Sequence, residues 1–341
     1  MKTIHLIAAA ALLTFASCSN DEVVESPAKA PIGFDSFIGK TTRADDATLG
    51  NVKSITVYGY IGEEGSTSRL FDGTIVSNTT GDWTYSPLQY WTAGKNYFFT
   101  AVASPAIAGN NHFSYAWSET LPTAIAGFYG TGVISYSNTA ATGAGNEDLI
   151  YAFATQTTPA TITAAPGRVQ FDFKHALSRV KFTFNNKMGS SAYTIKVHDL
   201  TINNTAAEGS LTLGDENPTW VANGSTPLQL RPGYYTPTDG TATNNNAVAS
   251  GTKFIIPESD KALTISFQID LIVSGNTIAT YTHNERALPT VSFKNGFSYN
   301  FVADIKPENI DPGHVLYPIL FNVTSVEGWT DAADETITLK P

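Results

Sequence analysis

Cys18 is the one cysteine of this 341-residue chain, and its thiol is the side chain best suited to covalent chemistry. It follows the largely apolar run 6–16 and the small residue Ser17, and the chain begins with Met1 and Lys2. A basic start, a short apolar core and a small residue at the cut are typical of a signal peptide. A lone thiol in an exported chain has no partner for an intramolecular disulfide. We therefore expect the thiol of Cys18 to be acylated.

The residues that precede Cys18 resemble the lipobox at which the signal of bacterial lipoproteins is cut. Ala16 and Ser17 fit the motif, and Phe15 stands where leucine is commoner. The resemblance implies that residues 1–17 are removed and that Cys18 carries lipid such as palmitate. An ordinary secretory signal with a chance cysteine is the alternative. Residues 18–30 are polar and acidic with a proline, and we expect them to form a flexible tether.

The sequence contains no pattern that favours catalysis or metal binding. Its six histidines neither stand four residues apart nor cluster with the cysteine, as metal ligands commonly do. A Gly-x-Ser-x-Gly elbow is also absent. We interpret His175 as a side chain that hydrogen-bonds across a bulge or domain junction. The sequence therefore predicts no enzymatic activity, no metal and no cofactor.

The composition indicates an exported β protein. Hydrophobic residues make up 42% of the chain, enough to bury a core, whereas charged residues make up only 15%. The formal net charge of −10 and the lack of a basic stripe argue against nucleic acid as a partner. After the signal, no segment is long and apolar enough to span a bilayer as a helix.

Apolar residues alternate with polar ones along most of the chain, which predicts strands with one buried face. The clearest cases are residues 55–61, 169–173, 263–271 and 297–305. Asn295-Gly296 predicts a two-residue hairpin between 291–293 and 297–299. Only residues 147–153 and 175–178 could hold a turn or two of helix. We predict a mainly β fold of antiparallel sandwiches with little helix.

The alternation of apolar and polar residues shifts by one position within residues 169–184. Val169 to Phe173 place apolar residues at odd positions, and Val180 to Phe184 place them at even positions. One straight strand cannot hold both halves, so residues 175–178 must form a turn or bulge where the chain changes sheet or domain. We place the domain boundary in the preceding Thr-, Ala- and Pro-rich stretch 157–167. This gives an N-terminal sandwich of residues 31–166 and a C-terminal sandwich of residues 167–341.

Three blocks together resemble the fimbrillin family, the Mfa-like subunits of lipoprotein-derived fimbriae. The first block is W-x-Y-S-P-x-x-Y-W at residues 83–91, followed by the aromatic stretch 94–99. The second combines D-L-x-Y-A at 148–152 with F-x-H-A-L-S-x-V at 173–180. The third is N-G-F at 295–297, with a closing V-E-G-W at 326–329. Their order and spacing carry the resemblance along most of the mature chain.

The resemblance implies an outer-membrane lipoprotein of two tandem transthyretin-like β-sandwiches. It further implies that an arginine-specific protease trims an N-terminal segment and that subunits then join by donor-strand exchange. Arg43-Ala44 fits the trimming site, since it lies in a polar stretch of small residues that a protease could bind in extended form. The alternative is an ordinary exposed arginine in a linker.

The segment that trimming would remove carries Ile32, Phe34 and Ile38 on one side of an extended stretch, 31–39. Burial of three such side chains would contribute a gross ~5–9 kcal/mol. Loss of this strand would expose an apolar groove and unpaired backbone, to which another chain's strand could add. Residues 336–339 could supply a donor strand, or could form the last strand of their own domain. So short a donor fits an anchor, tip or accessory subunit about as well as a stalk subunit.

We therefore expect a structural or adhesive subunit of a cell-surface fimbria, bound to the outer membrane by lipid. Its partners would be other fimbrial subunits, in a homo- or hetero-polymer, an arginine-specific protease and a host or glycan ligand. The alternative is a surface lipoprotein that does not polymerise and binds glycan through aromatic side chains. The aromatics in question are Trp83, Tyr85, Tyr90 and Trp91, for which packing in the core or at corners is the commoner role.

Overall fold

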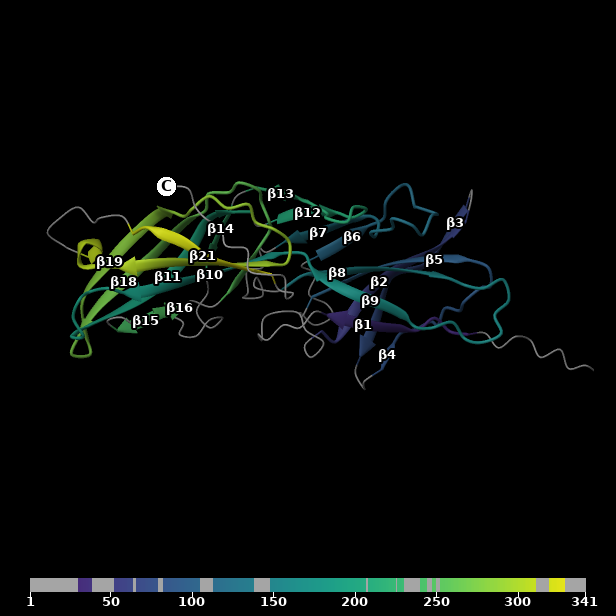
Figure 1. Ribbon diagram of the computed structural model, residues 1–341, viewed down its shortest axis with the longest axis horizontal. Helices are drawn as coiled ribbons and strands as arrows, with labels where there is room; N and C mark the ends of the chain where they lie inside the picture. The colour runs from purple at the N-terminus through teal and green to yellow at the C-terminus, as the bar shows by residue number, and fades with distance from the viewer. Residues whose placement is uncertain are drawn as a thin grey trace, which may run out of the picture.

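The computed structural model describes residues 30–38, 52–63, 66–78, 82–104, 113–137, 148–206, 208–224, 226–229, 240–243, 247–249, 252–310 and 319–328. These residues form four β-sheets in an elongated molecule, with the early strands at one end and the late strands at the other (Figure 1). The predicted mainly β fold is confirmed. Within the described ranges, the one helical element is the 3-10 helix η1 (Pro307–Ile310), and no helix is suited to cross a membrane.

The first sheet has seven strands in the order β1-β9-β8-β5-β2-β3-β4. In that order they are Phe34–Ile38, Val169–His175, Ile150–Thr157, Asn96–Ala103, Ser54–Glu63, Ser66–Asn78 and Trp83–Thr84. The sheet curls so that its first and last strands, β1 and β4, come into contact. Its concave face therefore encloses an apolar core to which β1, β2, β3, β5, β8 and β9 all contribute.

A four-stranded sheet packs near the convex face of the first sheet, in the order β13-β12-β7-β6. Its strands are Trp220–Asn223, Glu208–Thr212, Val133–Ser137 and Phe113–Ala116. A second core joins residues of β7 and β12 to Val102 of β5 and Tyr151 of β8. Strand β5 is buried on both faces because it lies between these two cores.

The two remaining sheets form the C-terminal sandwich. One has the order β16-β10-β20-β21, with β17 beside β10; its strands are Ala247–Ala249, Ser178–Asn186, Phe297–Ile305, Phe321–Gly328 and Lys253–Ile255. The other has the order β14-β11-β18-β19, with β15 beside β11; its strands are Thr226–Gln229, Tyr193–Thr205, Thr264–Val273, Asn276–Ala287 and Gly240–Thr243. The alternating apolar residues of β10, β11, β18 and β20 meet between the sheets in the largest core.

The change of phase at residues 175–178 marks a change of sheet, as the sequence predicted. Strand β9 ends at His175 in the first sheet, and β10 begins at Ser178 in the C-terminal sandwich. The chain therefore passes from the first sheet to the C-terminal sandwich about ten residues after the proposed domain boundary at residues 166/167. Strand β9 lies in the same sheet as the N-terminal strands. Strands β12 and β13, from residues 208–223, also join an N-terminal sheet, because β12 pairs with β7 and β13 pairs with β12.

Three local expectations were wrong. Residues 150–153 and 175 belong to strands, so the helix proposed for 147–153 and 175–178 does not form in the described part of those stretches. Asn295-Gly296 is a turn, but Val291 pairs with Lys261 and β20 pairs with β10 and β21, so no hairpin results. The sheets are also mixed, because β1 runs parallel to β9 and β10 runs parallel to β20. These strands are far apart in sequence, so no tight turn forces an antiparallel pairing.

Candidate functional site: the N-terminal strand

Strand β1 is an edge strand, and among the described strands β9 is its one ladder partner. The two run parallel, with Phe34 opposite Val169 and Ile38 opposite Phe173. On its other side, β9 pairs with β8 only through Lys174 and His175. Among the described strands, residues 169–173 of β9 therefore pair with β1 alone, and removal of β1 would leave that stretch without a described ladder partner.

The side chain of Phe34 lies at the centre of an aromatic cluster and is fully buried. Its ring contacts those of Phe71, Phe99 and Phe171 at centroid distances of 5.3, 5.8 and 5.7 Å. The ring of Tyr85 completes the cluster at 5.6 Å. The ring of Phe34 stacks on that of Phe171 and meets the other three rings edge-to-face, and aromatic pairs in such arrangements add to the free energy of burial. Removal of β1 would thus open an apolar space between β3, β5 and β9.

Arg168 binds the start of β1 from outside the sheet. Its Nε and Nη2 donate to the carbonyl oxygen of Phe34 at 3.2 and 2.7 Å. The same Nε lies 2.8 Å from Oδ1 of Asp35, and the amide of Gln170 donates to the other carboxylate oxygen at 2.9 Å. These groups are partly exposed, so the polar contacts fix the register of β1 and contribute less free energy than the burial of Phe34.

Residues 30–33 continue the strand's path and are hydrogen-bonded to the first sequence block, 83–91. The amide of Ile32 donates to the carbonyl of Gln89 at 2.9 Å, and the amide of Trp91 donates to the carbonyl of Ala30 at 3.0 Å. The hydroxyl of Tyr85 donates to the carbonyl of Ile32 at 2.8 Å. Burial raises the pKa of Tyr85, so this hydroxyl keeps its proton and remains a donor at neutral pH.

The sequence-predicted residues divide into those that this site contains and those outside the described residues. Ile32 and Phe34 are both buried, while Ile38 belongs to β1 and its side chain is not among those described. Cys18, Arg43 and Ala44 lie outside the described ranges, as does the stretch 336–339. Arg43 nevertheless lies between β1 and β2 in the chain. After a cut there, noncovalent contacts such as those above would hold β1 in the sheet.

The four aromatics considered for glycan binding have mainly structural positions. Trp91 is buried against Tyr97, and Trp83 and Tyr85 are partly buried against the concave core. Only Tyr90, which is 40% exposed, has a ring that solvent can reach widely. Core packing thus accounts for most of this block.

The second and third sequence blocks meet at the junction between the sheets. His175 Nδ1 lies 2.6 Å from Oδ2 of Asp148, and both side chains are buried. The amide of Ala176 donates to the carbonyl of Leu149, and the amide of Gly296 donates to the carbonyl of Leu177, both at 2.8 Å. This agrees with the interpretation of His175 as a hydrogen-bonding side chain at a junction. In the part of the chain that the structure describes, no group of acids, histidines or cysteines is arranged to hold a metal ion.

The profile of the fimbrillin-like family matches residues 42–317. The chain belongs to the fimbrillin-like family. The match begins after β1 and ends before β21, so these two edge strands lie outside it. Among curated protein sequences, none matches this fimbrillin-like chain significantly.

Solved structures to which the chain is similar include two fimbrial proteins. A fimbrial protein of Bacteroides vulgatus ATCC 8482 aligns with a TM-score of 0.60 at 19% identity, covering 88% of this chain and 100% of that chain. At this identity the likeness establishes the fold of the fimbrillin-like chain. The fimbrial anchor protein Mfa2 of Porphyromonas gingivalis aligns with a TM-score of 0.36 at 14% identity, covering 87% of this chain and 96% of that chain.

The sequence predicts an extended segment at β1 but does not identify the side chains that bind β1 or that pair at the junction between the sheets. Arg168 gave no local signal because its acceptor, Phe34, is 134 residues away in sequence. Tyr85 belongs to the first sequence block, and its contact with Ile32 depends on a fold that brings residue 85 to residue 32. Asp148 lay within a recognised block, but its pairing with His175 needed the junction geometry.

Proposed function

We propose that this chain is a structural or adhesive subunit of a lipoprotein-derived cell-surface fimbria. Cys18 is acylated and holds the precursor at the outer membrane. An arginine-specific protease cuts between Arg43 and Ala44, the segment that contains β1 leaves, and a strand of another subunit takes its place. The subunit polymerises or docks by this exchange.

The pairing of β9 is the observation that carries the proposal. Residues 169–173 form ladder bonds with β1 and with no other described strand. An unpaired row of amides and carbonyls beside an apolar space is the surface to which an extended chain adds as a strand. Phe34 occupies that space now. An incoming donor would therefore need a large apolar side chain at the position of Phe34.

Cleavage of the purified precursor with an arginine-specific protease tests this function. We expect a cut after Arg43, release of the N-terminal fragment and the appearance of stable oligomers. The variant Arg43→Ala should remain intact at that position and monomeric. Arg69→Ala is the matched control, since Arg69 lies exposed on β3 and its removal should leave both cleavage and assembly unchanged. A chain that is cut at Arg43 yet stays monomeric with its fragment retained would contradict strand exchange.

A surface lipoprotein that binds glycan and does not polymerise is the second candidate. The broad exposure of Tyr90 is the observation that favours it in the first sequence block. Protein that binds polysaccharide through Tyr90, with binding lost in Tyr90→Ala, and that forms no oligomers after cleavage would favour this candidate.

A further inference from the structure

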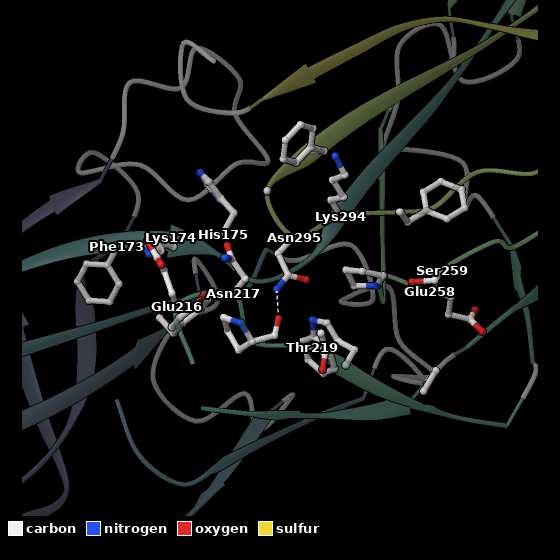
Figure 2. A pocket seen from close by; sticks show the side chains of 18 of the residues that line it. Phe173, Lys174, His175, Glu216, Asn217, Thr219, Glu258, Ser259, Lys294 and Asn295 are labelled. Carbon is white, nitrogen blue, oxygen red and sulfur yellow. Dashed lines mark hydrogen bonds between the residues drawn. The ribbon is translucent and has the colours of Figure 1, made fainter. Parts of the chain in front are cut away.

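A cavity of about 1060 Å3 opens at the junction between the first sheet and the C-terminal sandwich. Its walls come from the end of β9, the loop 216–219 before β13, the loop 257–259 and the turn 293–297 before β20 (Figure 2). Figure 2 shows Asn295 between the wall with His175 and Asn217 and the wall with Glu258 and Ser259. The second and third sequence blocks thus meet in one cavity whose size suits a small-molecule ligand.

Hydrogen bonds between the walls hold the cavity open without a ligand. The amide Nδ2 of Asn295 donates to the carbonyl of Pro218 at 2.8 Å, which is the dashed line in Figure 2. The indole Nε1 of Trp220 donates to the carbonyl of Ala176 at 2.7 Å, and the hydroxyl of Ser178 donates to the carbonyl of Lys294 at 2.7 Å. A ligand would therefore meet a preformed site, with little cost of ordering the protein.

The charges around the cavity are balanced. Two carboxylates, Asp172 and Glu216, are matched by two ammonium groups, Lys174 and Lys294. Glu258, the third acid of the lining, forms an ion pair with Lys261 at 3.0 Å. A phosphate or polyanionic ligand would find no excess of positive charge here, unlike the usual sites for such groups. The electrostatics favour a ligand without net charge.

The remaining lining groups suit a ligand with many hydroxyls. The amide of Asn217 and the hydroxyls of Thr219 and Ser259 can each donate and accept hydrogen bonds, and the carboxylate of Glu216 accepts them. Trp220 and Phe297 add aromatic surface, on which the apolar face of a sugar ring can pack.

An extended peptide fits this cavity less well than a sugar. On the side of β1, the backbone of Asp172 and Phe173 is already paired with Phe37 and Ile38, so an extended peptide cannot add to β9 there as a strand. We propose that the junction cavity binds a short neutral oligosaccharide. This site is distinct from Tyr90 and does not depend on strand exchange, because the uncleaved chain already contains it.

Binding by the uncleaved full-length protein tests the proposal. The probes are maltotriose, xylotriose, mannotriose and N-acetylchitotriose, with sialyllactose and trialanine as the charged and peptide comparisons. Saturation-transfer NMR identifies a binder and calorimetry measures its Kd. The cavity variant is the double substitution Glu216→Gln with Asn217→Ala, both exposed residues of a loop whose loss of polar groups should leave the fold intact. The matched control is Glu285→Gln with Asn276→Ala, an acid and an amide exposed on β19.

We expect at least one neutral trisaccharide to bind, with Kd at least tenfold higher in the cavity variant and within twofold of the parent in the control. Three results would overturn the proposal: no neutral probe binds, binding persists unchanged in the cavity variant, or sialyllactose or trialanine binds the cavity more tightly than every neutral probe. Cleavage at Arg43 and oligomer formation are measured separately, so failure here leaves the proposed assembly function untouched.

Discussion

The guanidinium of Arg168 donates to the carbonyl oxygen of Phe34 through both Nε and Nη2, at 3.2 and 2.7 Å. Arg168 immediately precedes β9, and Phe34 is the first residue of β1. The contact therefore joins β1 to β9, which is its ladder partner among the described strands. It lies at the point where β1 enters the sheet, so its loss should ease the departure of β1 without disturbing the core.

Substitution of Arg168 should weaken the hold on β1. Arg168→Met keeps the apolar part of the side chain and removes both donors, and because the group is partly exposed we expect a loss of about 1 kcal/mol. After cleavage at Arg43 the N-terminal fragment should dissociate about fivefold faster. Arg69→Met, on β3 of the same sheet, is the control and should leave that rate unchanged. Equal rates in the parent and Arg168→Met would mean that the contact does not retain β1.

Phe34 should contribute the largest share of the binding of β1. Phe34→Ala empties a fully buried aromatic position, which typically costs about 3–5 kcal/mol. Urea unfolding of the uncleaved chain should report this loss in the transition of the first sheet. Ile75→Ala is the comparison, since Ile75 is 53% exposed on β3. It should change the unfolding free energy by no more than about 0.5 kcal/mol. Similar stabilities for the two variants would show that β1 is not held by its core residue.

The buried pair of Asp148 and His175 should stabilise the junction between the sheets. Asp148→Asn removes the carboxylate from a 2.6 Å contact in a buried setting, for which a loss of about 1–3 kcal/mol is expected. Asp148→Asn and His175→Ala should be strongly non-additive in a double-mutant cycle, because each removes the same interaction. The pair of His198 with the exposed Asp199 is the control, where Asp199→Asn should have little effect. Additive losses at the junction would refute the coupling.

The stability of the C-terminal sandwich should fall in mild acid because of His283. Its ring is fully buried and stacks on Phe267 at a centroid distance of 5.1 Å. Burial, and secondly the charge of Arg286, lower the pKa of His283 from 6.5 to about 4. The unfolded chain then binds more protons between these values, so the stability from the neutral ring is complete above 6.5 and is lost as the pH falls toward 4.

Urea unfolding at pH 7 and pH 5 measures this dependence. His283→Phe keeps an aromatic ring beside Phe267 and removes the titration, so its unfolding free energy should decrease less between the two pH values. A variant with the same pH dependence as the parent would place the acid sensitivity at another group.

Attachment of the protein to the outer membrane should require the thiol of Cys18. Cys18→Ala removes the thiol that lipid would modify, and we expect the protein to leave the outer-membrane fraction of intact cells. Mass spectrometry of the parent should show the acylated cysteine at the mature N-terminus. If Cys18→Ala still fractionates with the outer membrane, the lipid anchor is refuted.

The sequence by itself determined four stretches that form strands and the place where the chain changes sheet. Alternation at 55–61, 169–173, 263–271 and 297–305 predicts strands, and strands are found there. The phase change between Phe173 and Val180 predicts the break at 175–178 because neighbouring side chains of a strand point to opposite faces. These features are local, so a short window of sequence contains them.

Only the tertiary structure decided which strands pair and what their side chains meet. The parallel pairing of β1 with β9, the pairing of β7 with β12 and the cavity between the sheets all join residues far apart in the chain. An alternating strand would fit several neighbours equally well. The choice among them depends on the burial of whole faces, such as the cluster around Phe34, and on single contacts such as Arg168 with Phe34. That selection is made by the folded chain as a whole, which is why no short stretch of sequence reveals it.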